Sequence, residues 1–500
     1  MQISNNSGEI YFSVIVKKYV KYDWSKWMKE YTVSKYLVRK SINDDYDFIY
    51  NSLYINSRII SHDLYAAINL IKGKSVQECK ELLGEDVFVE LQQNNFIVEC
   101  GQDERSQLKN ELLERKEKLE SGCFFQRMHL STTNKCNMNC EYCFCNQFEY
   151  SGGDLRFPSE KMEFDVADKA ITEAINVIKK NNNTSLSIEF FGGEPLLNHQ
   201  LIISVLEKYG NGENYGLEIT YGCTTNGAFV ADELLPYLKK YNVRVAISID
   251  YIDYEHNTFR GAGTSNIKWD QIDKNICKLS NQGIELKFQS VLSEQTWDKY
   301  NFNLIDYAAE KHIKAVGIIL SFDFEFYKKY SPKLIAAKVL EVNDYCKSKN
   351  IQLSGYWYLS FLGLIYPEQW NQRRDWKTCP TIGRLLSIEP NGDVYACKTT
   401  AKKMGNVNHF MDIFKNENYQ YYAMRAYSNS DECDGCEFEG VCSGNCAGAV
   451  EDKYKDISRT NKEYCETVKE ILNGLLTRYL KEIDIDQLIF QEGEGIESYE

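Results

Sequence analysis

The chain has 500 residues, 43% of them hydrophobic, which is enough for about two to four domains with sizeable cores. Its net charge of −14 argues against nucleic acid as the main partner, because phosphate binding needs a basic surface. Residues 1–18 lack the features of a signal peptide, and the longest apolar run, 356–366, is too short to span a membrane. We therefore expect a cytoplasmic protein without a membrane partner, in which the clustered cysteines among the 17 bind metal rather than form disulfides.

The first predicted domain spans residues 1–105. Its opening stretches are rich in β-branched and aromatic residues, which favours strands. Helical patterns follow, with N-caps at Ser61 and Ser75 and stops at Gly73 and Gly84. Strands followed by three short helices predict a winged-helix-like α+β domain. The expected strands are 9–16, 31–38, 47–53 and 56–60, and the expected helices are 61–70, 75–83 and 86–93.

Winged helices often bind DNA, but residues 1–100 carry 12 Lys and Arg against 13 Asp and Glu, which leaves no basic excess. The arrangement resembles the leader-peptide recognition domain of enzymes that modify ribosomally made peptides. That resemblance implies capture of a leader as an added strand, held through main-chain hydrogen bonds. A purely structural N-terminal cap is the alternative.

A charged helical linker over 106–123 precedes a region, 124–347, in which strands and helices alternate. Six such units predict an α/β fold whose parallel sheet curls into a partial (β/α)6 TIM-like barrel. Sites in such sheets lie at the carboxyl ends of the strands. The expected strands are 124–133, 185–191, 217–224, 243–250, 285–292 and 315–322, and the expected helices are 161–180, 201–209, 232–240, 267–279, 301–311 and 332–347.

Three cysteines follow the first predicted barrel strand. Cys136, Cys140 and Cys143 have the spacing Cys-x3-Cys-x2-Cys, so their thiolates can converge on one soft metal centre. A four-iron cluster held by three cysteines keeps one iron open to a ligand that is not protein. Taken alone, the run is also compatible with a zinc knuckle.

This motif, with Tyr142 before its last cysteine, resembles the signature of the radical S-adenosylmethionine (SAM) enzymes. The resemblance implies that Cys136, Cys140 and Cys143 hold a catalytic 4Fe–4S cluster whose open iron chelates SAM. An electron from a donor such as flavodoxin or ferredoxin then cleaves SAM to a 5′-deoxyadenosyl radical, which abstracts hydrogen from a substrate. Tyr142 matches the aromatic position that lies against the adenine.

Residues at the ends of later strands match other SAM contacts of this family. Gly192, Gly193, Glu194 and Pro195 match the motif that binds the amino group of SAM, and consecutive glycines let backbone approach a ligand closely. By the same resemblance, Asn226, Ser248 and Asp250 are candidates for contacts near the SAM ribose and carboxylate. Arg260 is a candidate partner of that carboxylate. Turn, cap or surface ion-pair roles are the alternatives for these four residues.

Seven cysteines in the C-terminal third form a second set. Their order resembles the SPASM extension, which carries two auxiliary 4Fe–4S clusters, so three 4Fe–4S clusters are implied in all. We expect residues 348–470 to form a bridging region and this SPASM domain, and 471–500 a C-terminal helix and acidic tail. The resemblance assigns Cys433, Cys436, Cys442 and Cys465 to one auxiliary cluster and Cys379, Cys397 and Cys446 to the other.

Two four-iron clusters would use eight thiolates. Residues 371–378, where fully ligated relatives carry a further cysteine, contain none. We therefore expect an open iron in the cluster of Cys379, Cys397 and Cys446, able to bind a substrate thiolate. The alternative is a remote fourth ligand, for which the candidates are Cys346, Cys145 and Cys123.

Together these resemblances imply a maturase of a ribosomally synthesised precursor peptide. The open iron favours thioether bonds between a cysteine sulfur and a carbon of the same peptide. A carbon–carbon or carbon–oxygen crosslink needs the same electron exit but no substrate thiol. Formylglycine formation, as in sulfatase maturases, is disfavoured because Lys398 stands where those enzymes carry an aspartate. The non-enzyme alternative is a DNA-binding iron–sulfur redox sensor.

Overall fold

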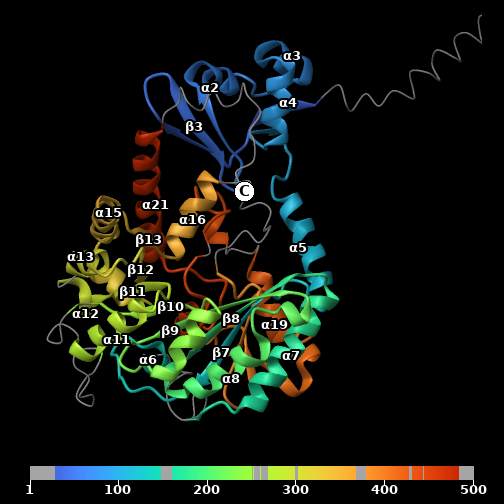
Figure 1. Cartoon of the computed structure of the whole chain (residues 1–500). Coiled ribbons are helices and arrows are strands. Elements are labelled where there is room, and N and C mark those ends of the chain that lie inside the picture. The colour runs from blue at the N-terminus through green and yellow to red at the C-terminus, as the bar shows by residue number, and fades with distance from the viewer. Residues whose placement is uncertain are drawn as a thin grey trace, which may run out of the picture. The chain divides into compact units, whose positions relative to one another are not determined.

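The computed structural model describes residues 29–147, 160–250, 252, 260, 269–298, 302–366, 379–426, 431–442 and 444–483. The predicted strand 9–16 lies outside these residues. The chain divides into two compact units (Figure 1). The first unit consists of residues 1–107 together with Gly435–Gly440, and the second of residues 108–434 and 441–500.

Within residues 29–107 the first unit contains two small antiparallel sheets and three complete helices, in agreement with the predicted helices and hairpin. Its elements are β1 (Glu30–Val33), β2 (Leu37–Ser41), β3 (Tyr46–Asn51), β4 (Ser57–Ser61), α2 (His62–Asn69), β5 (Lys74–Ser75), α3 (Val76–Leu83), α4 (Glu85–Gln93) and β6 (Ile97–Glu99). The sheets have the orders β5-β1-β6 and β2-β3-β4. The serines Ser61 and Ser75 cap α2 and α3 as expected.

The predicted strand 31–38 is wrong as a single element. The carbonyl of Ser34 accepts a hydrogen bond from the Leu37 amide at 3.1 Å, which closes a turn in the middle of the stretch. As a result β1 pairs in one sheet and β2 in the other. The residue pattern alone favours strand on both sides of the turn and does not show the break.

The segment Gly435–Gly440 packs within the first unit although it is distant in sequence. The buried ring of Phe438 stacks on the buried ring of Tyr50 in β3, with centroids 6.4 Å apart. The amide of Gly440 donates to the carbonyl of Ser52 at 2.7 Å. A Cβ at residue 440 would lie 2.8 Å from that same carbonyl oxygen, so only glycine allows this approach.

The second unit is built on a ten-stranded sheet with the order β13-β12-β11-β10-β9-β8-β7-β14-β15-β16. The strands are β7 (Arg127–Thr133), β8 (Ser185–Gly192), β9 (Glu218–Thr225), β10 (Arg244–Ser248), β11 (Leu286–Leu292), β12 (Ala315–Leu320), β13 (Gln352–Ser354), β14 (Leu385–Ile388), β15 (Asp393–Tyr395) and β16 (Lys403–Asn406). Strands β7 to β13 run parallel, β14 joins β7 in parallel, and β15 and β16 continue antiparallel. The predicted α/β class is confirmed: the six predicted strands correspond to β7 to β12, and β13 and β14 extend the parallel part of the sheet at its two sides.

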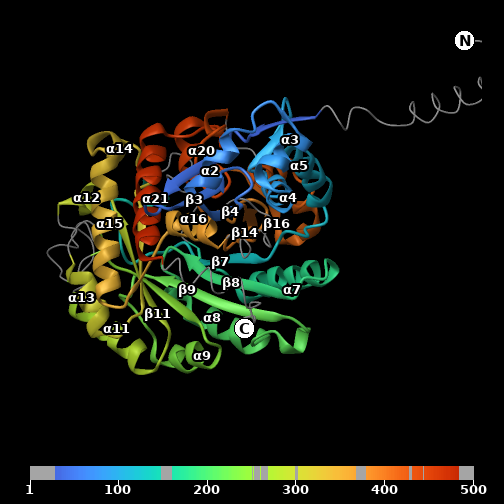
Figure 2. The ribbon, with the colours of Figure 1, turned by 90° about the horizontal axis from the view of Figure 1, so that it is seen from above.

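Helices connect the parallel strands and lie along the outer side of the sheet (Figure 2). They are α7 (Phe164–Lys180), α8 (His199–Tyr209), α9 (Leu235–Lys240), α11 (Trp269–Asn281), α13 (Asn303–Glu310) and α15 (Pro332–Ser348). The remaining helices of the second unit are α5 (Ser106–Leu119), α6 (Phe144–Gln147), α12 (Glu294–Trp297), α14 (Glu325–Lys329), α16 (Tyr356–Ile365), α18 (Phe410–Ile413), α19 (Glu417–Ala423), α20 (Ala447–Tyr454) and α21 (Lys462–Glu482). Among the described residues no helix is both long and apolar enough to cross a membrane.

The two faces of the parallel sheet differ in chemistry. On β7, Met128 and Leu130 are fully buried on one face, whereas His129 and Ser131 point to the other, because side chains alternate along a strand. The interior of a closed barrel is usually filled by branched apolar side chains. Here the face opposite the apolar one is polar, which suits a sheet that encloses a polar ligand.

The stacking of Phe438 on Tyr50 generates a prediction about the first unit. Replacing Phe438 with Ala should destabilise the β2-β3-β4 sheet by about 3 kcal/mol or more, because a large buried ring is removed. Hydrogen exchange of the β3 amides measures this. The partly exposed Phe229→Ala serves as control and should leave those amides unchanged. Unaltered β3 protection in F438A would show that the segment is not part of this unit's core.

Candidate active site

The three cysteines of the first motif lie on the loop that follows β7, at the carboxyl end of the sheet. The Cys136 thiol accepts a hydrogen bond from the Met138 amide at 3.4 Å. Burial raises the pKa of Cys136 to about 11, and the nearby Glu194, Cys140 and Cys143 add to the effect. Three soft donors close enough to affect one another fit an iron–sulfur cluster, which binds cysteines as thiolates.

The two glycines that end β8 fit against the cysteine loop. A Cβ on Gly192 would lie 2.2 Å from the carbonyl oxygen of Thr133, and one on Gly193 would lie 2.5 Å from that of Lys135. The Gly193 amide donates to Thr133 O at 2.8 Å. In this structure the close approach expected of the glycines is therefore made to the backbone that leads into Cys136.

The carboxylate of Glu194 is almost fully buried and accepts three hydrogen bonds. They come from the Leu196 amide at 3.1 Å, the Thr225 hydroxyl at 2.7 Å and the Asn226 amide at 2.7 Å. Burial nevertheless raises the pKa of Glu194 to about 7. The site therefore contains a carboxyl group that is partly protonated at neutral pH and that an ammonium group would ionise. Pro195 follows it as the first residue of a short 3-10 turn, Pro195–Asn198.

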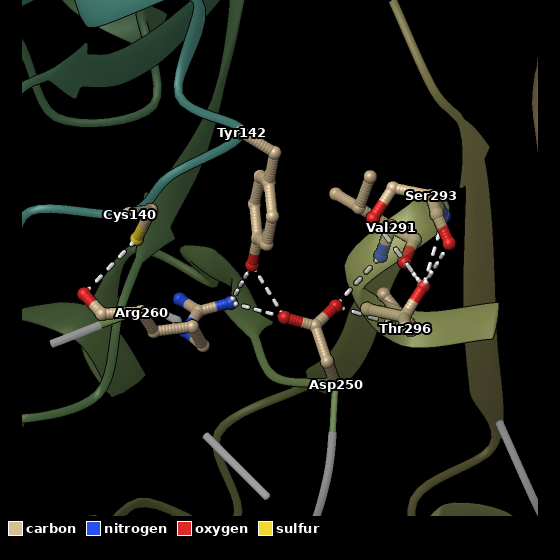
Figure 3. A network of polar contacts seen from close by, with 8 residues as sticks. Cys140, Tyr142, Asp250, Arg260, Val291, Ser293 and Thr296 are labelled. Carbon is tan, nitrogen blue, oxygen red and sulfur yellow. Dashed lines mark hydrogen bonds and ion pairs between the residues drawn. The ribbon is translucent and has the colours of Figure 1, made fainter. Parts of the chain in front are cut away.

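The buried side chains of Asp250 and Arg260 form one polar network with the half-buried Tyr142 (Figure 3). The Tyr142 hydroxyl donates to Asp250 Oδ2, and Arg260 Nη1 lies 3.0 Å from the same oxygen and 2.8 Å from the Tyr142 hydroxyl. The other carboxylate oxygen accepts the Val291 amide at 2.7 Å. Burial raises the pKa of Tyr142 well above its ordinary value, which keeps the phenol a donor. The alternative of a surface ion pair for Arg260 is therefore half right. Arg260 does pair with Asp250, but the pair is buried, since Arg260 is 6% exposed.

Arg260 also holds the cysteine loop through its main chain. Its carbonyl oxygen accepts the Asn139 amide at 3.2 Å and the Cys140 thiol at 3.5 Å (Figure 3). On the opposite side of the loop, the Asn226 side-chain amide donates to Asn137 Oδ1 at 2.7 Å. The structure thus brings Tyr142, Glu194, Asn226, Asp250 and Arg260 to the loop of the three cysteines, and Ser248 ends β10 two residues before Asp250.

Three cysteines of the second set lie near Tyr356, the first residue of α16. Desolvation by the surrounding protein, followed by the thiols of Cys379, Cys397 and Cys446, raises the pKa of this tyrosine. Tyr356 is nevertheless 55% exposed, so the three cysteines near it lie close to the solvent-accessible surface. The structure therefore brings together the three cysteines that the sequence assigns to one cluster.

Tyr464 in α21 has a similar environment. Burial, followed by the thiols of Cys442, Cys465 and Cys446, raises its pKa. Cys433 ends the short turn Asp431–Cys433 of the second unit. Cys436 belongs to the segment that packs in the first unit.

The cysteines considered as a remote fourth ligand have other surroundings. Cys346 is buried within α15, and burial raises its pKa to about 12. A hydrogen bond with the Cys143 side chain, together with burial, raises the pKa of the Cys145 thiol well above its ordinary value. The Cys123 thiol lies 3.6 Å from the carbonyl oxygen of Lys118. The described residues form no disulfide and hold no group of three His, Cys, Asp or Glu side chains in single-ion geometry.

The sequence motifs do not predict that Lys398 is a buried hydrogen-bond donor. In the sequence this residue only disfavours formylglycine formation. The ammonium group of Lys398, 1% exposed, bonds to Glu389 at 2.6 Å, Asn134 at 2.5 Å and Ser131 at 3.1 Å. The available signal was its position directly after Cys397. Nothing in the sequence around Glu389 indicates that this carboxylate is its partner.

Comparisons with known proteins show the family to which this chain belongs. Residues 130–300 match the model of the radical SAM superfamily, and residues 379–437 match that of SPASM, an iron–sulfur cluster-binding domain. The radical SAM cyclopropyl synthase TigE of Paramaledivibacter caminithermalis is 33% identical over 465 residues, which are 90% of this chain and 96% of TigE. The chain belongs to the radical SAM superfamily. It is a radical SAM/SPASM enzyme, as the cysteine motifs predicted.

Solved structures show the same fold for this radical SAM enzyme. Streptococcus suis SuiB bound to its precursor peptide SuiA superposes with a TM-score of 0.51 at 16% identity, covering 87% of this chain and 99% of SuiB. The enzyme anSMEcpe with bound AdoMet gives a TM-score of 0.58 at 19% identity, covering 73% of this chain and all of that one. At these identities the match concerns the fold alone.

The buried network of Figure 3 yields a prediction for the cysteine loop. Asp250→Ala should destabilise the second unit by about 3–5 kcal/mol, because it leaves the guanidinium of Arg260 buried without its carboxylate. Tyr142→Phe should cost only about 0.5–1.5 kcal/mol, since the ion pair remains. Denaturant unfolding measures both.

The exposed pair of Lys347 with Glu482 supplies the control, and Glu482→Ala should change stability by no more than about 0.5 kcal/mol. Iron bound per chain after reconstitution should fall in D250A and not in E482A. A D250A protein with wild-type stability would show that the network does not hold the loop.

Proposed function

We propose that this enzyme closes a ring within a ribosomally made precursor peptide, with loss of two hydrogens per link. The observation that carries the proposal is the 33% identity with a cyclopropyl synthase over 90% of the chain, which also matches the radical SAM and SPASM family models. The fold it shares with SuiB, a protein solved with its precursor peptide, supports a peptide substrate.

We propose that Cys136, Cys140 and Cys143 hold the SAM-binding 4Fe–4S cluster, and that the second cysteine set holds two more. Held there, the cluster and SAM would supply the radical chemistry for removing a hydrogen atom from the peptide. For each link the peptide would lose that hydrogen atom, one proton and one electron, and the cysteines of the second set would hold the clusters that accept the electron.

The chain's own residues orient SAM and the loop. The Glu194 carboxylate would accept the amino group of SAM, because it is the buried acid at the end of β8. Asn226 and Ser248 are the proposed polar contacts to the ribose and carboxylate. Since Asp250 and Arg260 already satisfy each other, we assign them first to holding Tyr142 and the cysteine loop.

Two kinds of link compete. A carbon–carbon bond that closes a small ring is favoured by the similarity to the cyclopropyl synthase. A thioether is favoured by the three thiols of Cys379, Cys397 and Cys446 near Tyr356, which would hold a four-iron cluster with one iron open to a substrate thiolate. We put the carbon–carbon ring first, because the similarity to the cyclopropyl synthase covers 90% of the chain.

The first unit would bind the leader of the precursor. Its β2-β3-β4 sheet has β2 and β4 at its edges among the described strands, and an edge strand offers unpaired main-chain groups to an added strand. Tethering the leader there would raise the local concentration of the region to be modified. We also expect a flavodoxin or ferredoxin to supply the electron.

Tandem mass spectrometry of the precursor peptide encoded beside the gene, after anaerobic reaction with SAM and reductant, tests the proposed function. We expect a loss of two hydrogens per link with the cysteines still open to alkylation. The same loss with blocked cysteines would establish the thioether instead. An unchanged mass with no deuterium uptake from solvent would contradict the proposal.

The pKa of Glu194 predicts how SAM binding depends on pH. The acid is protonated below pH about 7, and the ammonium group of SAM favours the ionised form. Affinity should therefore rise about tenfold between pH 5.5 and 7, below the range in which an α-amino group loses its proton. Equilibrium binding to the reconstituted protein measures this.

In Glu194→Gln the affinity should be lower and should not change over the same interval. The change keeps the size of the side chain, and the amide oxygen of glutamine can still accept from Leu196 and Thr225, but the bond from the Asn226 amide to the second oxygen is lost. A variant with the pH profile of the wild type would assign the dependence to another group.

A further inference from the structure

A group of charged side chains lies on the polar face of the parallel sheet, the face to which His129 points. Glu189 in β8 is the register partner of His129 in β7. Arg244 in β10 joins the same row through Gly222 in β9. Lys287 in β11 lies beside the residue two positions after Arg244. Register partners project their side chains to the same face of a sheet, so these charged groups share the polar face.

The polar face is accessible to solvent, whereas the opposite face is buried. On β8, Ile188 and Phe190 are fully buried, while Glu189 between them is partly exposed. On β11, Phe288 is fully buried and the preceding Lys287 is partly exposed. The charged groups are therefore within reach of a ligand from solution.

Two glycines give the charged side chains room to lie across neighbouring strands. A Cβ on Gly222 would be 2.0 Å from Glu189 Oε2, so the carboxylate lies over β9. The Thr224 hydroxyl donates to the other carboxylate oxygen at 2.9 Å. A Cβ on Gly317 would be 3.2 Å from Lys287 Cε, so the lysine stem extends over β12. The carboxylate and the lysine thus lie over strands that β10 and β11 separate.

Three cations act on the single carboxylate of this group. They are Arg127, Arg244 and Lys287. Burial lowers the pKa of Lys287, Glu189 opposes this change, and Arg244 adds to it. None of the three cations forms an ion pair or a side-chain hydrogen bond with the described part of the chain. Positive charge is therefore in excess here and has no direct partner among these residues.

Arg244 and Lys287 are the two cations that most need a negative partner. They stand on the adjacent strands β10 and β11, where like charges destabilise a sheet. The acidic residues Glu218 and Glu285 stand at the exposed amino ends of β9 and β11, where water screens their charges. Because a partly buried cation without a carboxylate is costly, this pair indicates an anionic ligand.

The pair is remote from the proposed SAM contacts. Arg244 is the first residue of β10 and Ser248 is the last, so about 13 Å of strand separates them at roughly 3.3 Å per residue. Glu194 and Asn226 follow the carboxyl ends of the neighbouring strands β8 and β9. The anion that Arg244 and Lys287 suit therefore belongs to a molecule other than SAM.

We propose that Arg244 and Lys287 bind a carboxylate of the precursor peptide and thereby select the segment that is modified. This inference rests on the proposed function for the identity of the peptide. An extended chain spans about 3.3–3.6 Å per residue, so the carboxylate would stand roughly three or four residues from the residue that reacts beside SAM. It belongs to an Asp or Glu side chain or to the C-terminus of the precursor.

Lys287→Met tests the site, because it keeps the length of the side chain and removes its charge. The Kd of the precursor should rise about tenfold, the loss expected for one bond between charged groups. Arg244→Gln should have the same effect, and Arg244→Lys, which keeps the charge, a smaller one. The unfolding midpoint of K287M should stay the same or rise, because the charge that it removes is repelled by Arg244.

Lys274→Met supplies the matched control. Lys274 is an exposed residue of α11, one of the helices on the outer side of the sheet (Figure 2), and its loss changes the net charge equally. This variant should bind the precursor with the Kd of the wild type. Iron content and the 5′-deoxyadenosine formed without peptide should be equal in wild type, K287M and K274M, because the proposed site holds neither cluster nor SAM.

Variants of the precursor identify the carboxylate. Each acidic residue after the leader is replaced in turn by its amide, and one further peptide carries a C-terminal amide. Fluorescence anisotropy with the reconstituted full-length enzyme gives the Kd of each peptide. We expect one neutral peptide to bind wild type about tenfold more weakly than the parent precursor does, and to bind K287M as tightly as the parent does. Which peptide this is distinguishes a side chain from the C-terminus.

The outcomes separate this inference from the proposed function. A K287M protein with the Kd of the wild type would overturn the carboxylate site, even if the peptide is modified. The site would also fall if no neutral peptide bound wild type more weakly, or if K287M lost the same affinity for every peptide, as expected when the cations hold a free inorganic anion or water. The expected pattern of binding without any ring closure would overturn the proposed function alone.

Discussion

The cysteine loop is held in place by backbone contacts on two sides. On one side the amides of Gly193 and Glu194 donate to the carbonyls of Thr133 and Lys135, at an approach that leaves no room for a Cβ. On the other side the carbonyl of Arg260 receives the loop. Any shift of β8 relative to β7 therefore moves the three thiols, which makes the junction of these strands the constraint on which the site depends.

Electrostatics supports the same arrangement. Arg260 would be costly to bury alone, and Asp250 and Tyr142 together satisfy it. Lys398 and Glu389 form a second buried pair farther along the sheet. Each pair also hydrogen-bonds to a residue in or beside the cysteine loop, Tyr142 for the first pair and Asn134 for the second, and so ties the loop to segments that are distant in sequence. Buried pairs add little net stability, but their geometry is demanding.

Much of this fold could be predicted because each element follows from local pattern. The parallel strands from 185–192 to 315–320 are short apolar or alternating runs bounded by helices. The break between β1 and β2 was missed because it depends on one turn at Ser34 within a continuous strand-like stretch. The cysteine sets were found from spacing. The bond between Lys398 and Glu389 was not, since only the pairing of β14 with β7 brings these residues to the loop at Asn134.

The segment Gly435–Gly440 has a consequence for the evolution of such enzymes. The first unit is completed by Phe438, by the amide of Gly440 and by Glu437, which bonds to Lys40 at 2.9 Å. Its fold is thus encoded at two distant places in the chain, one of them between cysteines of the second set. The unit is therefore not a freely exchangeable module. A recombination event that replaced residues 1–107 by those of another enzyme would have to bring a compatible segment at 435–440 as well.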